Sequence, residues 1–377
     1  MLRRSLLLSG LLGWNLDAVA ASAITPSAAL PRRTLAFPRD HGAHPEFRTE
    51  WWYITGHAQA GSGAGAREFG FQVTFFRSRV DTTQGMASAF AAKQLVFAHA
   101  AVTDVQGKKL WHDQRMAREG FGVAEARLAD AGLRLRDWSL GRMPADGAAA
   151  GKAPGPAGPD AAWRTQLPSR DFSLDLQFVP TQPLLLQGDH GLSRKGPEPA
   201  QASYYYSLPQ LAARGGLTLK GQRFEVTGRA WLDHEWSEAL LHPEAVGWDW
   251  IGMNLFDGSA LTAFRLRDKS GAALWDAGSF RAPSGEMHGF SRGEVVFSPQ
   301  RVWKSPLSQA SYPVEWIVRT PADFYTVKPV LDQQEMDSRA STGAIYWEGL
   351  SDLFDSNGRH VGRGYLEMTG YAQPMRL

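Results

Sequence analysis

Short runs of alternating apolar and polar residues dominate this chain, and helical periodicity is nearly absent. Gly, Asp, Asn or Pro separates successive runs, as expected where strands end in turns. The segments Asp104–Lys108 and Asp268–Gly271 each lie between two runs and are predicted to be hairpin turns. This pattern predicts an all-β fold of antiparallel strands in a sandwich or barrel. Examples of the runs are Trp52–Gly56, Phe69–Phe76, Leu95–Thr103, Phe224–Trp231 and Trp248–Phe256.

Two segments depart from this pattern. Ser207–Ala213 is predicted to be a short helix, with Ser207 as the N-cap, Pro209 in the first turn and Gly215-Gly216 after its end. Residues 144–160 are rich in Ala, Gly and Pro, and we expect a low-complexity surface loop there because such a composition buries little apolar area.

A weak internal repeat indicates two domains. Glu50–Gly56 (EWWYITG) resembles Gly247–Met253 (GWDWIGM), and each is followed by a strand that ends in arginines. Two copies of one β-rich unit explain the resemblance. We therefore expect a first domain over residues 36–215 and a second over residues 216–377.

The first 23 residues have the pattern of a signal peptide. Arg3 and Arg4 precede the apolar run Leu6–Leu12, and small residues near position 20 suit cleavage. The apolar run is too short to span a bilayer. The sequence thus predicts an exported, soluble protein, periplasmic or secreted, with no transmembrane segment and with Sec or twin-arginine export both open.

Composition narrows the classes of function. The chain has no cysteine, which excludes disulfides and thiolate chemistry, and its formal net charge of +2 gives no basic surplus for nucleic acid. Aromatic residues make up 11% of the chain, which favours an apolar or aromatic small molecule as the partner.

The segment Trp231–Trp250 (WLDHEWSEALLHPEAVGWDW) carries the richest chemistry. It combines four tryptophans with five acids and two histidines. Indole rings beside titratable groups are typical of a pocket wall where acid–base chemistry takes place. Strand alternation places Asp233 and Glu235 on one face and His234 on the other. The alternative is a pair of ordinary strands with aromatics inside and charges outside.

A second group of polar residues lies in Asp40–Glu46 (DHGAHPE), followed by Glu50. His41 and His44 could bind zinc, with a nearby glutamate as the base. Three-residue spacing on a loop does not place both rings on one face, however. The interpretation we favour is a loop that closes one end of the first barrel, anchored by Trp51 and Trp52.

The sequence resembles the carotenoid 1,2-hydratase (hydroxyneurosporene synthase) superfamily, and within it the AttH-like exported proteins. The resemblance implies two lipocalin-like antiparallel β-barrel domains. It also implies water addition or cyclisation on apolar polyenes or polycyclic compounds, with no cofactor. The motifs that carry it are DHGAHPEFRTEWWYITGH (Asp40–His57), FGFQVTFFR (Phe69–Arg77), SYYYSLPQLAARGGL (Ser203–Leu217), GRAWLDHEWS (Gly228–Ser237) and GWDWIGMNLFDG (Gly247–Gly258).

The resemblance also implies catalytic positions. His234 and Trp236 match the family's His-x-Trp element, and Asp249 matches its aromatic-x-Asp element, although Gly247 stands where the carotenoid enzymes have Tyr. Asp249 between two indoles could keep its proton and act as the acid, with His234 orienting the water and Trp236 stabilising positive charge. The alternative is that Asp249 pairs with an arginine such as Arg265. The ligand-binding residues we expect are Trp231, Trp248, Trp250, Trp52, Tyr53 and Tyr205.

Three functions remain open. The first is a cofactor-independent hydratase or isomerase acting on an apolar lipid, isoprenoid or polyene. The second is a non-catalytic lipid-binding protein that serves an envelope ABC transporter. The third is a metal-dependent hydrolase built on His41 and His44.

Overall fold

A computed structural model describes residues 29–144, 161–239 and 241–375. The signal peptide expected at residues 1–23 lies outside this part of the chain, as does nearly all of the loop at 144–160. Strands joined by turns and loops make up the described residues, and the helices among them are three single-turn 3₁₀ helices, η1 (Arg39–His41), η2 (Gly63–Gly65) and η3 (Asp81–Thr83). Within these ranges we find no helix that is long and apolar enough to cross a bilayer.

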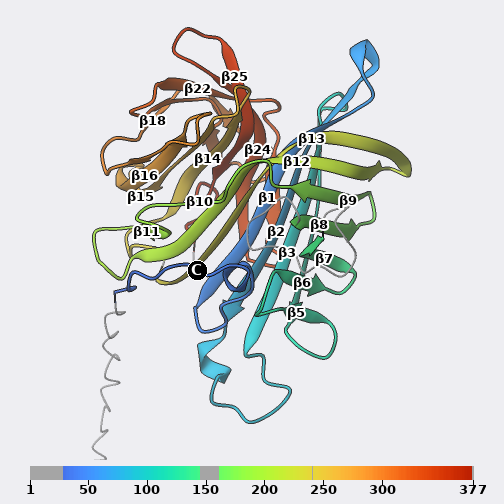
Figure 1. Ribbon diagram of the computed structural model, residues 1–377, viewed down its shortest axis with the longest axis vertical. Helices are drawn as coiled ribbons and strands as arrows, with labels where there is room; N and C mark the ends of the chain where they lie inside the picture. Colours follow the sequence, from blue (N-terminus) through green and yellow to red (C-terminus); the bar gives the residue numbers. More distant parts are fainter. Residues whose placement is uncertain (1–28, 145–160, 240, 376–377) are drawn as a thin grey trace, which may run out of the picture.

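The first sheet curves into a nearly closed barrel (Figure 1). Its strands follow the order β4-β3-β2-β1-β13-β12-β9-β8-β7-β6-β5, and β3 and β4 at one edge approach β5 and β6 at the other. The short strands β10 and β11 pair with β12 beside this path. The strands are β1 (Thr49–Ala60), β2 (Arg67–Arg79), β3 (Gln94–Asp104), β4 (Lys109–Arg118), β5 (Ala124–Ala126), β6 (Gly132–Leu135), β7 (Trp138–Pro144), β8 (Ala161–Pro168), β9 (Phe172–Val179), β10 (Leu185–Leu186), β11 (Leu192–Arg194), β12 (Ala202–Leu219) and β13 (Gln222–Ala239).

The second sheet has the order β17-β16-β15-β14-β25-β24-β22-β21-β18, with β23 paired to β24. A separate two-stranded sheet, β19 and β20, accompanies it. The expected all-β fold of two lipocalin-like antiparallel units is confirmed. The strands are β14 (Gly247–Leu255), β15 (Ala260–Arg267), β16 (Ala273–Arg281), β17 (Met287–Phe290), β18 (Val296–Pro299), β19 (Val302–Lys304), β20 (Ser311–Pro313), β21 (Trp316–Arg319), β22 (Phe324–Pro329), β23 (Glu335–Ser338), β24 (Ala344–Phe354) and β25 (His360–Met368).

The two sheets share a topology that explains the internal repeat. β1 opens the first sheet between β2 and β13, and β14 opens the second between β15 and β25. Both predicted hairpin turns are confirmed, since β3 ends at Asp104 before β4, and β15 ends at Arg267 before β16.

The helix expected at Ser207–Ala213 is wrong. These residues lie within β12, which pairs with both β13 and β9. The pairing of β12 with β13 shifts register between Leu208 and Leu211, and Gln210 has φ of 56°. This β-bulge absorbs the Pro209-Gln210 step that resembles a helix start. The boundary expected at 215/216 also falls inside β12, and the change from the first sheet to the second comes between Ala239 and Gly247.

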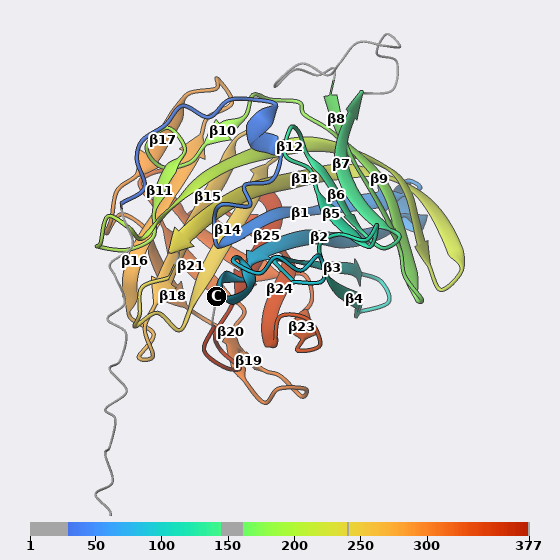
Figure 2. The same cartoon turned by 90° about the horizontal axis from the view of Figure 1, so that it is seen from below.

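The outer face of the first barrel packs against the second sheet. Strands β1, β2 and β13 contact β25, β24 and β14, and Figure 2 shows the second sheet, in orange and red, beside the first. Residues 230–237 of β13 are consequently buried on both faces, because one face lines the barrel and the other faces the second sheet.

Candidate functional site

A cavity of about 260 Å³ lies between the two sheets. The first barrel contributes the outward-facing residues of its central strands, and the second sheet contributes residues of β14, β15, β24 and β25. Interfaces between packed domains are common positions for ligand sites. The residues that define the interbarrel cavity include Trp51, Tyr53, Phe76, Phe97, His99, Lys195, Tyr205, Asp233, Glu235, Trp248, Trp250, Phe264, Tyr346, Glu348 and Glu367.

Aromatic rings form most of the apolar wall. Tyr53 of β1 meets Trp250 of β14 edge to face, with ring centroids 5.4 Å apart. Trp231 lies behind Trp250, with ring centroids 6.4 Å apart, and is fully buried. The two sheets therefore contribute rings to one continuous apolar surface.

Asp233 is a buried acid on the barrel side of the interbarrel cavity. Its carboxyl group accepts hydrogen bonds from Ser207 Oγ at 2.5 Å, Trp231 Nε1 at 2.7 Å and the Tyr205 hydroxyl at 2.7 Å. Burial raises its pKa to about 7 in spite of these three donors, and the nearby charge of Glu235 acts in the same direction. Asp233 therefore exchanges its proton near neutral pH.

Two further acids face Asp233 from the second sheet. Glu348 on β24 and Glu367 on β25 are direct cross-strand partners, and both line the interbarrel cavity, Glu348 buried and Glu367 half-buried. Burial raises the pKa of Glu367 to about 7, and burial together with the charge of Glu367 raises the pKa of Glu348 well above its usual value. Trp248 Nε1 donates to Glu367 at 3.1 Å. Glu348 Oε1 and the Tyr53 hydroxyl make no hydrogen bond of good geometry with any described residue.

Glu235 differs from these three acids because a cation accompanies it. Lys195 Nζ lies 2.9 Å from Glu235 Oε1, and Ser203 donates to the same oxygen. The Lys195 ammonium also lies over the rings of Phe264 and Tyr205, 4.1 and 4.7 Å from their centroids. An ion pair and two ring faces thus hold one ammonium group at the wall of the cavity.

His99 is the imidazole of the cavity wall. Its Nδ1 lies 2.8 Å from the Tyr346 hydroxyl and its Nε2 lies 2.8 Å from Ser341 Oγ, so His99 bridges the two sheets. Burial lowers its pKa to about 3, and His99 is neutral at physiological pH.

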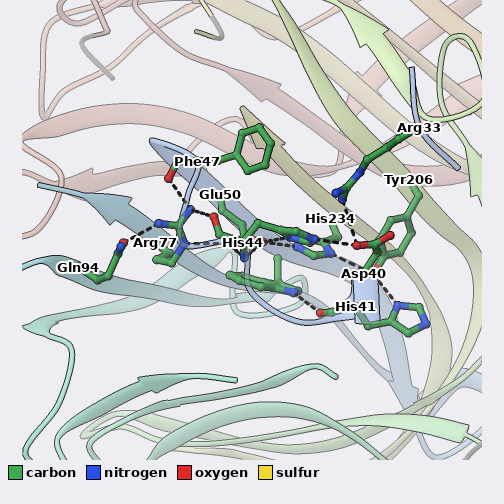
Figure 3. A network of polar contacts seen from close by, with 11 residues as sticks. Arg33, Asp40, His41, His44, Phe47, Glu50, Arg77, Gln94, Tyr206 and His234 are labelled. Atoms are coloured by element: carbon green, nitrogen blue, oxygen red, sulfur yellow. Dashed lines mark hydrogen bonds and ion pairs between the residues drawn. The ribbon is translucent and has the colours of Figure 1, made fainter. Parts of the chain in front are cut away.

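A buried network of polar side chains joins the loop before β1 to the inner side of the first barrel (Figure 3), and two of its members, Glu50 and Arg77, also reach the cavity. Glu50 Oε1 lies 2.7 Å from His44 Nδ1 and 2.9 Å from His234 Nε2, while Glu50 Oε2 accepts from Arg77 Nε at 2.8 Å. His44 Nε2 lies 3.0 Å from Asp40 Oδ1. These contacts fix the loop before β1 to β1, β2 and β13, as expected for a loop that closes the barrel.

The protons of this network are divided unequally between the two histidines. Burial opposes protonation of His44, but hydrogen bonds to Asp40 and Glu50 outweigh burial and raise its pKa. Burial lowers the pKa of His234 to about 4, against the opposing effect of Glu50. Burial raises the pKa of Glu50, but hydrogen bonds from both histidines dominate and hold it well below its usual range. The network therefore favours a proton on His44 and disfavours one on His234.

The same network contains side chains of the kinds that bind metal ions. Ligand atoms of His44, Glu50 and His234 lie within 4.8 Å of one another, and two histidines with one carboxylate suit zinc. These atoms already form hydrogen bonds with one another, however, and Arg77 forms an ion pair with Glu50. His41, which we had grouped with His44, points instead to the Tyr206 hydroxyl at 2.7 Å.

Asp249 does not lie at the interbarrel cavity, contrary to the role we expected for it. Trp248 and Trp250 line the cavity, so alternation turns Asp249 to the opposite face of β14. There it pairs with Arg265 Nε at 2.8 Å and accepts from the Tyr371 hydroxyl at 2.9 Å. Asp249 and His234 consequently lie at different sites, and the alternative of an Asp249–Arg265 pair describes the structure.

The other residues we expected divide between the two sites. Tyr53, Tyr205, Trp248 and Trp250 line the interbarrel cavity, with Trp231 directly behind it. Inside the barrel, Trp52 stacks on His234 with ring centroids 4.5 Å apart, and Trp236 stacks on His44 at 3.9 Å.

Among the cavity residues that the sequence analysis missed are His99, Lys195, Glu348 and Glu367. A signal for the two glutamates exists, since each is the single acid of a short, strongly apolar run, AIYWEGL and GYLEM. No comparable signal marks His99 or Lys195.

Comparison with known proteins gives a consistent result. The AttH-like family matches residues 28–371 of this chain. The crystal structure of a candidate AttH protein from Nitrosomonas europaea is 43% identical, with a TM-score of 0.81, covering 91% of this chain and 99% of that one. Kievitone hydratase from Nectria haematococca is 12% identical, with a TM-score of 0.63 over 92% of this chain and 98% of its own, and shares the fold. No curated protein matches the chain.

Proposed function

The chain belongs to the AttH-like family, and from this premise we propose that it binds an apolar small molecule in the interbarrel cavity and acts on it by hydratase-type acid–base chemistry. The single observation that carries this proposal is Asp233, a buried carboxyl group with a pKa of about 7 in a cavity walled by aromatic rings. A protonated acid beside an apolar ligand is what water addition to an alkene requires.

The chemistry can be written with the residues of the cavity. Asp233 gives its proton to one alkene carbon, which leaves a carbocation at the other. Water adds to that carbocation through its oxygen, and the ionised carboxyl group of Glu367, across the cavity, accepts the proton that the water loses. Proton exchange with solvent restores both carboxyl groups, so the net change is addition of one water to one double bond.

The aromatic wall supports the charged stage of this reaction. The faces of Trp250 and Tyr53 present negative electrostatic potential to a cation, which is worth about 2 kcal/mol when the cation is desolvated. Kievitone hydratase shares this fold, and its name states water addition, so the fold is compatible with the proposed reaction.

We extend the proposal to location and ligand class. The basic and apolar pattern of residues 1–23 supports export to the periplasm or beyond. A lipid, isoprenoid or polyene fits a narrow cavity with aromatic walls.

The test begins with native mass spectrometry of the protein purified from its own envelope fraction, followed by identification of any bound compound. Incubation in H₂¹⁸O then shows whether the compound gains one oxygen from water. We expect ¹⁸O incorporation by the wild type and none by Asp233→Asn, with Asp249→Asn as the matched control that keeps turnover. Binding without ¹⁸O incorporation would overturn the enzymatic part and favour a carrier protein.

A further inference from the structure

We infer that the ligand of the interbarrel cavity carries a positively charged centre, an amine or quaternary ammonium group, on an apolar body. The inference rests on the proposed ligand-binding role of the cavity and adds the charge of the ligand to it. The group that would meet the cation is the acid group formed by Asp233, Glu348 and Glu367.

The charge balance of the buried acids is the first argument. Several buried carboxylates of the described chain have cationic partners, as Glu50 has Arg77 and Asp249 has Arg265, whereas Glu335 is held by the neutral donors Ser305, Ser308 and Tyr312. Asp233, Glu348 and Glu367 form none of the ion pairs found among the described residues, although all three line one cavity. A buried acid without a cation is costly, and a cationic ligand would supply the missing partner.

An unused acceptor in the cavity is the second argument. Glu348 is only 2% exposed, and its Oε1 makes no hydrogen bond of good geometry with a described residue, the Tyr53 hydroxyl being the donor group near this carboxyl group. Most buried polar atoms in proteins have a partner. The open acceptor lies on a residue of the cavity wall, which points to a donor or a positive charge contributed by the ligand.

The cavity already holds one ammonium group in this manner, which is the third argument. The Lys195 ammonium is placed between the Glu235 carboxylate and the ring faces of Phe264 and Tyr205. Glu348 and Glu367 lie at the same cavity as Trp248, Trp250 and Tyr53. Carboxylates combined with aromatic faces are the usual means of binding alkylammonium groups.

The experiment compares two probes of equal shape and different charge. Benzyltrimethylammonium carries a cation, and neopentylbenzene is its uncharged carbon isostere. Affinities for the wild-type protein are measured at pH 8 by tryptophan fluorescence and calorimetry. We expect the Kd of benzyltrimethylammonium to be at least about tenfold lower than that of neopentylbenzene. A tenfold difference in Kd corresponds to about 1.4 kcal/mol of binding free energy.

A variant locates the effect. In the double variant Glu348→Gln/Glu367→Gln we expect the two probes to bind with about equal affinity, and we expect binding of neopentylbenzene to be retained. The control is Glu335→Gln. Glu335 is a buried acid on β23 that lies outside the cavity and accepts a hydrogen bond from the Tyr312 hydroxyl at 2.8 Å. This variant should keep the wild-type preference for the cationic probe.

Each outcome decides between the two proposals. Equal or tighter binding of neopentylbenzene by the wild type overturns the inference of charge and leaves the apolar-ligand proposal standing. Failure of both probes at millimolar concentration overturns the inference, and the ¹⁸O experiment then decides the proposed function independently. The wild-type comparison requires no variant, so poor folding of the double variant would not prevent a decision.

Discussion

Glu348 and Glu367 face each other directly across the pairing of β24 with β25, at the wall of a buried cavity. Like charges at directly opposed strand positions destabilise a sheet. The pair can lie side by side because burial, together with the charge of Glu367, keeps the proton on Glu348. The two acids are thus proton-binding groups on the wall of the cavity opposite Asp233.

The first prediction concerns the dependence of stability on pH. The pKa of Asp233 rises from 3.8 to about 7 on folding, so the folded state holds a proton that the unfolded chain releases. This favours folding fully below pH 3.8, and the stabilisation is lost as pH rises toward 7. In Asp233→Asn this loss should disappear. Between pH 4 and pH 8 the free energy of unfolding of the variant should therefore fall by a few kcal/mol less than that of the wild type. Urea unfolding at both pH values measures it, and parallel curves for variant and wild type would contradict it.

The second prediction separates the two aspartates of the tryptophan-rich segment. Asp249→Asn should reduce the free energy of unfolding by about 3 kcal/mol, because Arg265 loses a buried partner. Binding of an apolar fluorescent probe in the cavity should be unchanged in this variant, since Asp249 lies on the other face of β14. Denaturant titration and probe titration on the same samples give both values, and a lost probe site in a folded Asp249→Asn would refute the assignment.

The third prediction concerns the network inside the barrel. Glu50→Gln should reduce the free energy of unfolding by about 3–5 kcal/mol, because His44 and Arg77 lose their shared carboxylate. Glu46→Gln lies on the same loop with an exposed side chain and should change stability by less than about 0.5 kcal/mol. Chemical denaturation compares the two, and equal effects would show that the network contributes little.

The fourth prediction concerns the ion pair at the cavity wall. Lys195→Met should destabilise the fold by about 3 kcal/mol, because Glu235 is left buried without its cation. Adding Glu235→Gln to Lys195→Met should recover part of the loss, since a neutral amide is less costly to bury than an unpaired carboxylate. A double-mutant cycle by urea unfolding measures the coupling, and additive effects would argue against a coupled pair.

The fifth prediction uses a glycine behind the aromatic wall. A Cβ atom at Gly252 would lie 2.3 Å from the Trp250 ring and 3.3 Å from Trp231. Gly252→Ala should therefore displace the Trp250 indole, cost about 1–3 kcal/mol of stability and weaken cavity binding. Gly289→Ala meets no atom within 4 Å and serves as the control. Unchanged tryptophan fluorescence in Gly252→Ala would contradict the prediction.

Much of the fold could be predicted from alternation, because a period of two residues specifies a strand whichever barrel it joins. Ser207–Ala213 was assigned to a helix because local capping signals cannot report that β13 pairs along that segment while β10 and β9 pair with its two ends. Tertiary pairing outweighed the local preference. The bulge at Gln210 obscured the alternation at the same place.

The site was harder to predict, for a geometric reason. Alternation places Asp233 and Glu235 on one face of β13 and His234 on the other, and the structure has this arrangement. It does not indicate which face meets the second sheet. Asp249 was selected for the indoles beside it in sequence, yet neighbours along a strand point to opposite sides. Glu348 and Glu367 join the cavity through long-range pairing, which sequence spacing does not reveal.

One consequence follows from the double burial of β13. Inserting or deleting a single residue before Leu232 would exchange its two faces, turning the carboxylates into the closed barrel and the imidazole toward the cavity. Both sites would fail together, although every side chain needed for each would still be present. We therefore expect mutational scanning to show that a single substitution in Leu232–Trp236 affects one of the two sites, whereas a change in the length of this segment abolishes both. In this segment the number of residues matters as much to both sites as which residues they are.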